Sequence, residues 1–152
     1  GVDGDSASCA ELCAILSSLA DLPIRQGLAM TGSVNQLGRM QPIGGVTEKV
    51  EGFFDVCRSA GLTGEQGVIV PVQNVDNLML KDEVVEAVRQ GIFHVYAVRC
   101  VEEAIEMLTG LPAGACDQEG LYPGDTVFGR VARKLLDYQE RLQALDHGTL
   151  WA

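Results

Sequence analysis

The chain has 152 residues, long enough to bury a substantial core and too short for two domains of ordinary size. Eleven basic residues against 21 acidic ones give a net charge of −10. This balance argues against nucleic acid or an anionic membrane as the main partner, because both attract a basic surface. No apolar run approaches the roughly 18 residues of a membrane span, and the first residues do not have the pattern of a signal peptide.

Alternating helix and strand patterns predict an α/β domain with some parallel strand pairing. The strand at 67–70 is continuously apolar and is closed by a proline, which suits a strand buried on both faces. The predicted elements, in chain order, are a helix at 7–20, strands at 28–34 and 39–43, a helix at 46–60, a strand at 67–70, a helix at 81–90, a strand at 93–98 and a helix at 101–108.

Several local features of these elements are also predicted. The segment from Ser8 to Glu11 fits a capping box at the start of the first helix, although Gly4 or Asp5 could equally be the cap. A turn at 35–38 joins the first two strands, with Gly38 free to take a positive φ. The residues expected to face inward are Val46, Val50, Phe53 and Cys57 in the helix at 46–60, and Val84, Val85 and Val88 in the helix at 81–90.

The pattern of the C-terminal part predicts a linker at about residues 111–125, followed by a helical extension at 126–146. Apolar residues recur along this helix at helical spacing, and we expect it to dock on the domain, with partner contacts as the alternative. The stripe consists of Val127, Val131, Leu135, Tyr138, Leu142 and Leu145.

The five cysteines are odd in number and include no C-x-x-C pair, which favours reduced, mostly buried thiols in a cytoplasmic protein. The alternative is one reactive thiol, for which Cys116 in its loop-like stretch is the best candidate. The five are Cys9, Cys13, Cys57, Cys100 and Cys116.

The two histidines do not favour a Ser-His-Asp triad. His94 lies in a strand pattern and His147 lies in the tail, and neither sits in a turn typical of a catalytic residue. No clustered ligand motif indicates a metal, and no P-loop motif indicates ATP binding by this chain. We therefore expect no cofactor in this chain.

A serine and a lysine remain as candidates for chemistry. Ser6 lies at the start of the first helix, where backbone amides could stabilise an oxyanion, although Ser6 or Ser8 could simply cap the helix. Lys49 borders an apolar stripe, and partial desolvation would lower the pKa of its ammonium, so that it could accept a proton from a serine. The alternative for Lys49 is a surface side chain. Spacing alone does not bring Ser6 and Lys49 together.

Two sets of motifs, taken together, resemble the proteolytic domain of Lon proteases. The segment Asp3-Gly-Asp-Ser-Ala-Ser8 resembles the nucleophile motif of that family. The segments Ala29-Met-Thr-Gly32, Gly38-Arg39 and Pro42-Ile-Gly-Gly-Val-Thr-Glu-Lys49 resemble the region that carries its catalytic lysine. The order and the interval between serine and lysine are also those of the family.

The resemblance implies an α/β Lon-type domain over 1–110, with a mixed sheet and flanking helices. It implies Ser6 as the nucleophile and Lys49 as the general base of a Ser-Lys dyad. Thr31 would help to hold the lysine amine, and Asp3 could pair with Lys49 in the idle site. Family members are ATP-dependent endoproteases of misfolded and regulatory proteins, and they form rings, usually of six subunits.

Two motif positions depart from the bacterial Lon pattern of proline before the serine and glycine two after it. Asp5 and Ser8 occupy these positions, in a form similar to the divergent LonB-like branch. We expect the chain to be the C-terminal piece of a longer protein whose missing part carries upstream strands and the ATP-binding module. The alternatives are a non-catalytic Lon-like ring or interaction domain, and an unrelated α/β binding protein.

Overall fold

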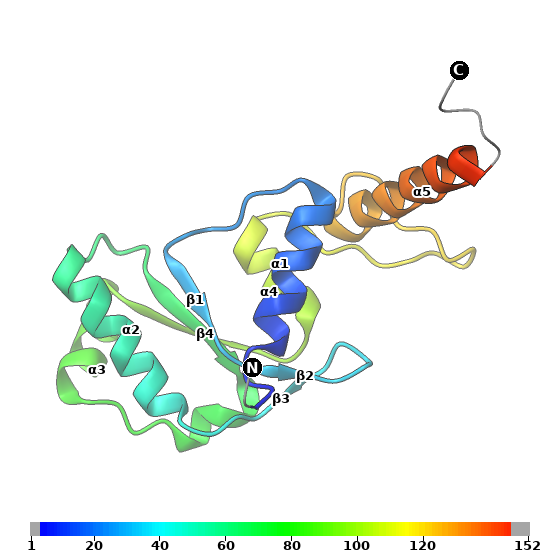
Figure 1. The fold of residues 1–152 in the computed structure, drawn as a ribbon. Coiled ribbons are helices and arrows are strands. Elements are labelled where there is room, and N and C mark those ends of the chain that lie inside the picture. The colour runs from blue at the N-terminus through cyan, green and yellow to red at the C-terminus, as the bar shows by residue number, and fades with distance from the viewer. Residues whose placement is uncertain (1–3, 147–152) are drawn as a thin grey trace.

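The computed structural model describes residues 4–146. Its elements are α1 (Ser8–Ala20), β1 (Leu28–Met30), β2 (Ser33–Val34), β3 (Met40–Gln41), α2 (Val46–Ala60), β4 (Gly67–Pro71), the 3₁₀ helix η1 (Val72–Asn77), α3 (Asp82–Arg89), β5 (His94–Val98), α4 (Val101–Thr109) and α5 (Val127–Asp146). Figure 1 shows their arrangement. Among these residues, no helix combines the length and the apolarity that crossing a membrane requires.

The central sheet has the order β1-β4-β5, and both of its strand pairs are parallel. A separate antiparallel hairpin is formed by β2 and β3. Its turn contains Gly38 with a φ of +74°, as expected, and the backbone N–H of Gly38 donates to the Asn35 carbonyl. The predicted α/β class with a mixed arrangement of strands is confirmed.

Two apolar cores lie on the two faces of the sheet, and β4 contributes to both. All five residues of β4 are buried, as predicted for a strand covered on both faces. Ile69 packs into the core formed with α1 and α4, whereas Val68 and Val70 pack into the core formed with α2 and α3. Helices α1 and α4 therefore cover one face of the sheet, and α2 and α3 cover the other (Figure 1).

The predicted strand at 28–34 is divided into β1 and β2, with Thr31 and Gly32 between them. The backbone of Gly32 does not pair with a strand here but bonds to the segment around α1: its N–H donates to the Ser6 carbonyl and its carbonyl accepts from Cys9 N–H. A Cβ atom on Gly32 would lie 2.2 Å from the Met40 side chain. A larger residue here would require the Met40 and Pro71 side chains to shift.

The predicted capping box is wrong. The N-cap of α1 is Ala7, and no side chain caps this helix. The Ser8 hydroxyl instead accepts a hydrogen bond from the backbone N–H of Val34 at 3.0 Å. Ser8 is thus used for a tertiary contact with β2.

Two inward faces also differ from the prediction. In α2 the third buried position is Phe54, while Phe53 is half-buried. In α3 the buried residues are Val84 and Ala87, and Val85 and Val88 are exposed. Both differences have one cause: adjacent apolar residues in a short amphipathic helix leave the rotation of the helix ambiguous.

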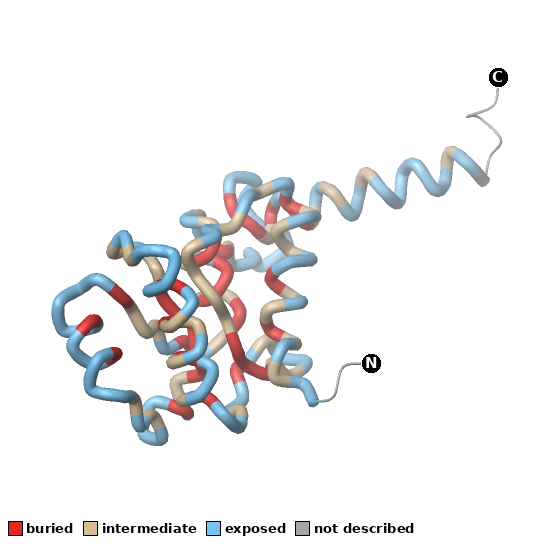
Figure 2. The backbone as a smooth tube through the Cα atoms, turned by 60° about the vertical axis from the view of Figure 1, so that its left-hand side comes forward, coloured by how far each residue is buried: buried red, intermediate tan, exposed pale blue. Residues whose placement is uncertain are grey.

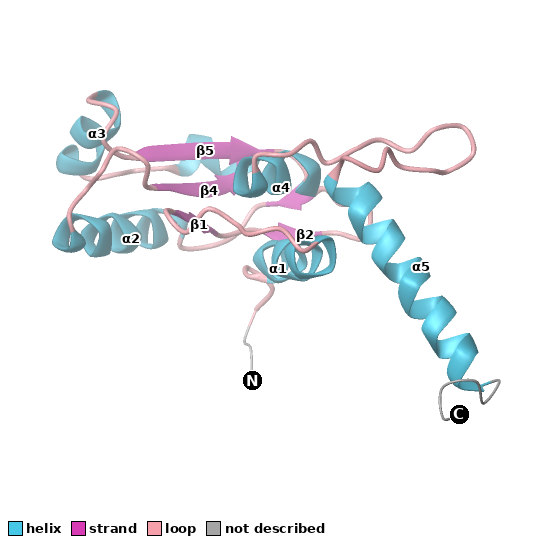
Figure 3. Ribbon diagram, turned by 90° about the horizontal axis from the view of Figure 1, so that it is seen from above, coloured by secondary structure: helices cyan, strands magenta, loops and turns pink. Residues whose placement is uncertain are grey.

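The expected docking of α5 holds only for its first turns. Val127 and Val131 are buried in the core shared with α1 and α4. Beyond them the helix leaves the body of the domain (Figure 3), and its surface is largely exposed (Figure 2). Beyond Val131, the exposed apolar residues of α5 are Leu135, Leu136, Tyr138, Leu142 and Leu145.

The cysteines are mostly buried, as expected, and all five are free thiols. Cys9, Cys13 and Cys57 are buried, Cys100 is half-buried and Cys116 is exposed. The exposed position of Cys116 agrees with its prediction as a loop thiol.

Candidate active site

Ser6 lies in the turn that leads into α1, and its backbone is fixed by the residues that follow β1. The Ser6 carbonyl accepts two hydrogen bonds, from Gly32 N–H at 2.8 Å and from Thr31 Oγ1 at 3.2 Å. Thr31 itself continues the pairing of the central sheet, because its N–H donates to the Ile69 carbonyl at 3.0 Å. Thr31 therefore links Ser6 to the central sheet by hydrogen bonds.

Lys49 lies in the first turn of α2, which begins at a glycine with a left-handed backbone. Gly45 has a φ of +67°, and its carbonyl accepts a hydrogen bond from Lys49 N–H. The segment just before this turn is held by Asn74 of η1, which donates to the Ile43 carbonyl and accepts from Ile43 N–H. The start of α2 therefore rests on a buried amide side chain.

The fold brings Ser6 and Lys49 together across 43 residues of sequence. Lys49 Nζ lies 2.9 Å from Ser6 Oγ, within hydrogen-bond distance. It also lies 3.3 Å from Thr31 Oγ1. The Thr31 hydroxyl thus accepts from the lysine amine and donates to the Ser6 carbonyl, so that it connects both residues.

The surroundings of Lys49 differ from the expectation of a partly desolvated amine. Lys49 is exposed and Ser6 is half-buried, whereas Thr31 is buried. The described residues therefore leave the hydroxyl and the amine open to an incoming substrate. They do not by themselves remove the amine from water.

Two of the backbone N–H groups that were expected to stabilise an oxyanion already donate hydrogen bonds within the protein. The N–H of Ser8 donates to the Asp5 carbonyl at 3.0 Å, and the N–H of Cys9 donates to the Gly32 carbonyl at 3.2 Å. These two amides do not point to a substrate. Asp3, expected to pair with Lys49, lies outside the described residues.

Residues 1–110 match the family described as Lon protease (S16) C-terminal proteolytic domain. The chain belongs to the Lon protease family.

Three relatives illustrate the similarity to Lon proteins. A protein of Escherichia coli (strain K12) named as a Lon protease homolog is 56% identical over 110 residues, which cover 72% of this chain and 19% of the relative. A homolog from Haemophilus influenzae is 49% identical over 109 residues, 72% of this chain and 18% of the relative. An archaeal Lon protease of Halobacterium salinarum is 44% identical over 88 residues, 58% of this chain and 12% of the relative. The Lon-type chain thus spans less than a fifth of the length of these three relatives.

The sequence did not point to Asn74 or Ser33 as residues that support the site. Both are buried polar residues with side-chain hydrogen bonds to segments that carry Ser6 or Lys49. Asparagine and serine are common in turns and caps, so nothing in the sequence distinguishes these two. Only their burial and their hydrogen bonds to the segments that carry Ser6 and Lys49 distinguish them.

His94 has a structural place, as expected. Its Nε2 lies 2.8 Å from the Gly64 carbonyl, and its ring stacks on Tyr96 with 5.6 Å between centroids. The second histidine, His147, lies outside the described residues.

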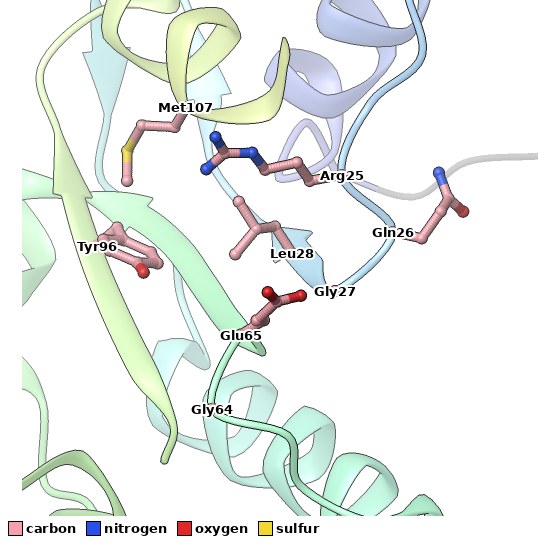
Figure 4. Close-up of a pocket in the computed structure, with 8 residues that line it drawn as sticks. All are labelled: Arg25, Gln26, Gly27, Leu28, Gly64, Glu65, Tyr96 and Met107. Atoms are coloured by element: carbon pink, nitrogen blue, oxygen red, sulfur yellow. The ribbon is translucent and has the colours of Figure 1, made fainter. Parts of the chain in front are cut away.

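A cavity of about 730 Å³ lies near the amino end of β1, whereas Thr31, whose hydroxyl lies 3.3 Å from Lys49 Nζ, follows the carboxyl end of β1. Arg25 and Glu65 lie at this cavity, together with the apolar parts of Tyr96 and Met107 (Figure 4). Ser6 and Lys49 do not line it. Among the described residues of this Lon-type domain, this cavity and the Ser6–Lys49 pair are therefore separate features.

Proposed function

We propose that this chain is the proteolytic domain of an ATP-dependent Lon-like protease, a serine endopeptidase with Ser6 as nucleophile and Lys49 as general base. One observation carries the proposal: the 2.9 Å separation of Lys49 Nζ and Ser6 Oγ in a chain that belongs to the Lon family. At this distance a proton can pass between the two atoms without rearrangement.

The chemistry follows the Ser-Lys variant of nucleophilic catalysis. Ser6 Oγ forms a bond to the carbonyl carbon of the scissile peptide while its proton passes to the neutral amine of Lys49. Collapse of the tetrahedral intermediate breaks the C–N bond, and the Lys49 ammonium gives its proton to the leaving amine. Water then attacks the acyl-enzyme with Lys49 again acting as base, which releases the second product and restores Ser6.

Thr31 and Asp3 complete the proposed site. The Thr31 hydroxyl, 3.3 Å from Lys49 Nζ, would direct the amine toward Ser6 and keep it there between proton transfers. Asp3 would pair with the lysine ammonium when no substrate is bound. Both roles rest on the family resemblance, and for Thr31 also on the distances given above.

The remaining parts of the proposal concern the whole protein. We expect protein and peptide substrates, a homo-oligomeric ring of six subunits, ATP bound by a module outside this chain, and a cytoplasmic location. Family membership and the names of the relatives as Lon proteases support these expectations. The net charge of −10 supports a domain that does not itself bind nucleic acid.

The test is a fluorophosphonate probe applied to the full-length protein, followed by mapping of the modified residue, beside peptide hydrolysis. We expect labelling at Ser6, and a loss of at least about a thousandfold in kcat for Ser6→Ala and for Lys49→Ala. His94→Gln is the control, expected to retain the activity. Undiminished hydrolysis by Ser6→Ala would refute the proposal.

The alternative of a non-catalytic ring or interaction domain predicts assembly without labelling. It is less well supported, because both dyad positions are filled and their side chains lie within hydrogen-bond distance. The test uses the full-length protein because this chain spans less than a fifth of the length of the three relatives described above.

A further inference from the structure

Four consecutive residues after β1 each make a hydrogen bond to the turn that carries Ser6. We name Thr31, Gly32, Ser33 and Val34 the 31–34 strip. Thr31 Oγ1 and Gly32 N–H both donate to the Ser6 carbonyl, and the Gly32 carbonyl accepts from Cys9 N–H. The other two members of the strip bond to the side chains of Asp5 and Ser8. The hydrogen bonds of the strip therefore fix the backbone of the turn that carries Ser6.

Asp5 is anchored to the strip through Ser33. Ser33 is 3% exposed, and its hydroxyl lies 2.5 Å from Asp5 Oδ2 and 3.3 Å from Gln41 Oε1. Ser33 has one hydroxyl proton, and the nearer acceptor is a carboxylate, which makes the stronger bond. Asp5 immediately precedes Ser6, so this bond fixes the chain on one side of the nucleophile.

Ser8 fixes the chain on the other side. Its hydroxyl accepts from Val34 N–H at 3.0 Å, at the last residue of β2. Removal of this hydroxyl would leave a partly buried backbone donor without its partner, which is costlier than the loss of the bond alone. The two anchors therefore flank Ser6 and reach adjacent residues of one short strand.

The same strip also contacts the base. Thr31 Oγ1 lies 3.3 Å from Lys49 Nζ, so one element contacts both partners of the proposed proton transfer. Proton transfer is sensitive to displacements of about 0.5 Å, and residues that hold a nucleophile in place contribute to the rate without touching the substrate. Asp5 and Ser8 are also the two positions at which the sequence departs from the bacterial Lon motif.

Resting on the function proposed above, we propose that Asp5 and Ser8 are positioning residues, which hold Ser6 Oγ against Lys49 Nζ by anchoring the nucleophile turn to Ser33 and to the Val34 amide. The two departures from the bacterial motif thus form a matched pair of side-chain anchors. Neither residue exchanges a proton with the substrate.

The test measures acylation by a fluorophosphonate probe in the full-length protein, with the rate constant and the final labelled fraction recorded separately. Asp5→Ala, Ser33→Ala and Ser8→Ala each lower the rate constant about tenfold, the loss expected for a hydrogen bond that orients a catalytic group. The final labelled fraction stays at the wild-type value, and KM for a peptide substrate changes less than about twofold.

Three variants sharpen the assignment. Asp5→Asn keeps an acceptor for the Ser33 hydroxyl and recovers most of the rate. The double variant Asp5→Ala/Ser33→Ala is no slower than the slower single variant, because both changes remove one bond. Asp125→Ala, which removes an exposed carboxylate near the start of α5, is the matched control with the wild-type rate.

The possible outcomes separate this inference from the proposed function. Wild-type rate constants for Asp5→Ala and Ser33→Ala, with Ser6→Ala inactive, overturn the positioning role alone. A reduced final labelled fraction with an unchanged rate constant also overturns the positioning role, because this result shows that less protein is folded and not that the labelling reaction is slower. Full hydrolysis by Ser6→Ala overturns the proposed function itself. If Asp5→Ala does not fold, Asp5→Leu and Ser33→Ala carry the same test.

Discussion

Thr31 Oγ1 lies 3.3 Å from Lys49 Nζ and, at the same time, donates a hydrogen bond to the Ser6 carbonyl. One buried hydroxyl group thereby joins the two residues on which the proposed chemistry depends. Its removal should affect the rate of the reaction more than the binding of a peptide.

We predict that Thr31→Val, which keeps the shape and removes the hydroxyl, lowers kcat about tenfold with little change in KM. Thr31→Ser, which keeps the hydroxyl, should recover most of the activity. Steady-state peptide hydrolysis by the full-length variants, with thermal unfolding to verify the fold, provides the measurement. Equal activity of the valine variant and the wild type would contradict the role of Thr31.

The two halves of α5 should differ in their effect on stability. Val127→Ala removes two methyl groups from a fully buried position and should lower the free energy of unfolding by about 2 kcal/mol. Leu142→Ala, at a side chain that is 62% exposed, should change it by less than about 0.5 kcal/mol. Urea unfolding of both variants measures the difference. A large loss for Leu142→Ala would mean that the distal half packs on something in solution.

The stability should also decline in acid partly through Glu51. The backbone N–H of Lys81, and with it the Lys81 amine, holds the pKa of the Glu51 carboxyl below its usual value. A carboxyl with a lowered pKa in the folded state stabilises the fold above its unfolded pKa of about 4.5, and this contribution is lost as the pH falls through the folded value.

We therefore expect Glu51→Gln to lose less stability than the wild type between pH 7 and pH 3, as measured by urea unfolding at each pH. Lys81→Met is the informative control, because it removes the amine and keeps the backbone N–H that makes the larger contribution. It should retain much of the acid dependence. Identical pH profiles for Glu51→Gln and the wild type would rule out this source of acid sensitivity.

The free thiols should differ in their reactivity. Cys116 is exposed, whereas burial raises the pKa of the Cys57 thiol and reduces its thiolate fraction at neutral pH. We expect a thiol reagent to modify Cys116 first in the native chain, and Cys116→Ser to abolish that fast phase. Mass spectrometry of peptides after brief alkylation identifies the site. Equal labelling of Cys9 and Cys116 in the folded protein would contradict the observed burial.

Periodicity was sufficient to predict helices but not to predict contacts between segments. The helix at 46–60 was predicted with the bounds that it has, because its amphipathic pattern is long and its end is marked by glycine. The strand at 28–34 was predicted as one element, because the interruption at Gly32 depends on the Met40 side chain and on the turn at Ser6. The 3₁₀ helix η1 was not predicted, because Asn74 is held there by Ile43, 31 residues away.

The same limit applies to the site. Apolar spacing suggested a half-buried Lys49, but only the motif resemblance paired it with Ser6, because proximity across 43 residues depends on the whole fold. Nothing in the local sequence around Ser33 or Asn74 indicated a role at the site. Their importance depends on burial and on partners from other elements, and neither can be inferred from local pattern.

The placement of the 31–34 strip has a consequence during synthesis and folding. Thr31 reaches its position by pairing with Ile69 of β4, and the turn of Ser6 takes its position from the strip. A nascent chain that has emerged only as far as α2 contains both Ser6 and Lys49, yet it lacks the strand on which their alignment depends. We therefore expect Ser6 and Lys49 to become aligned only after β1 has paired with β4.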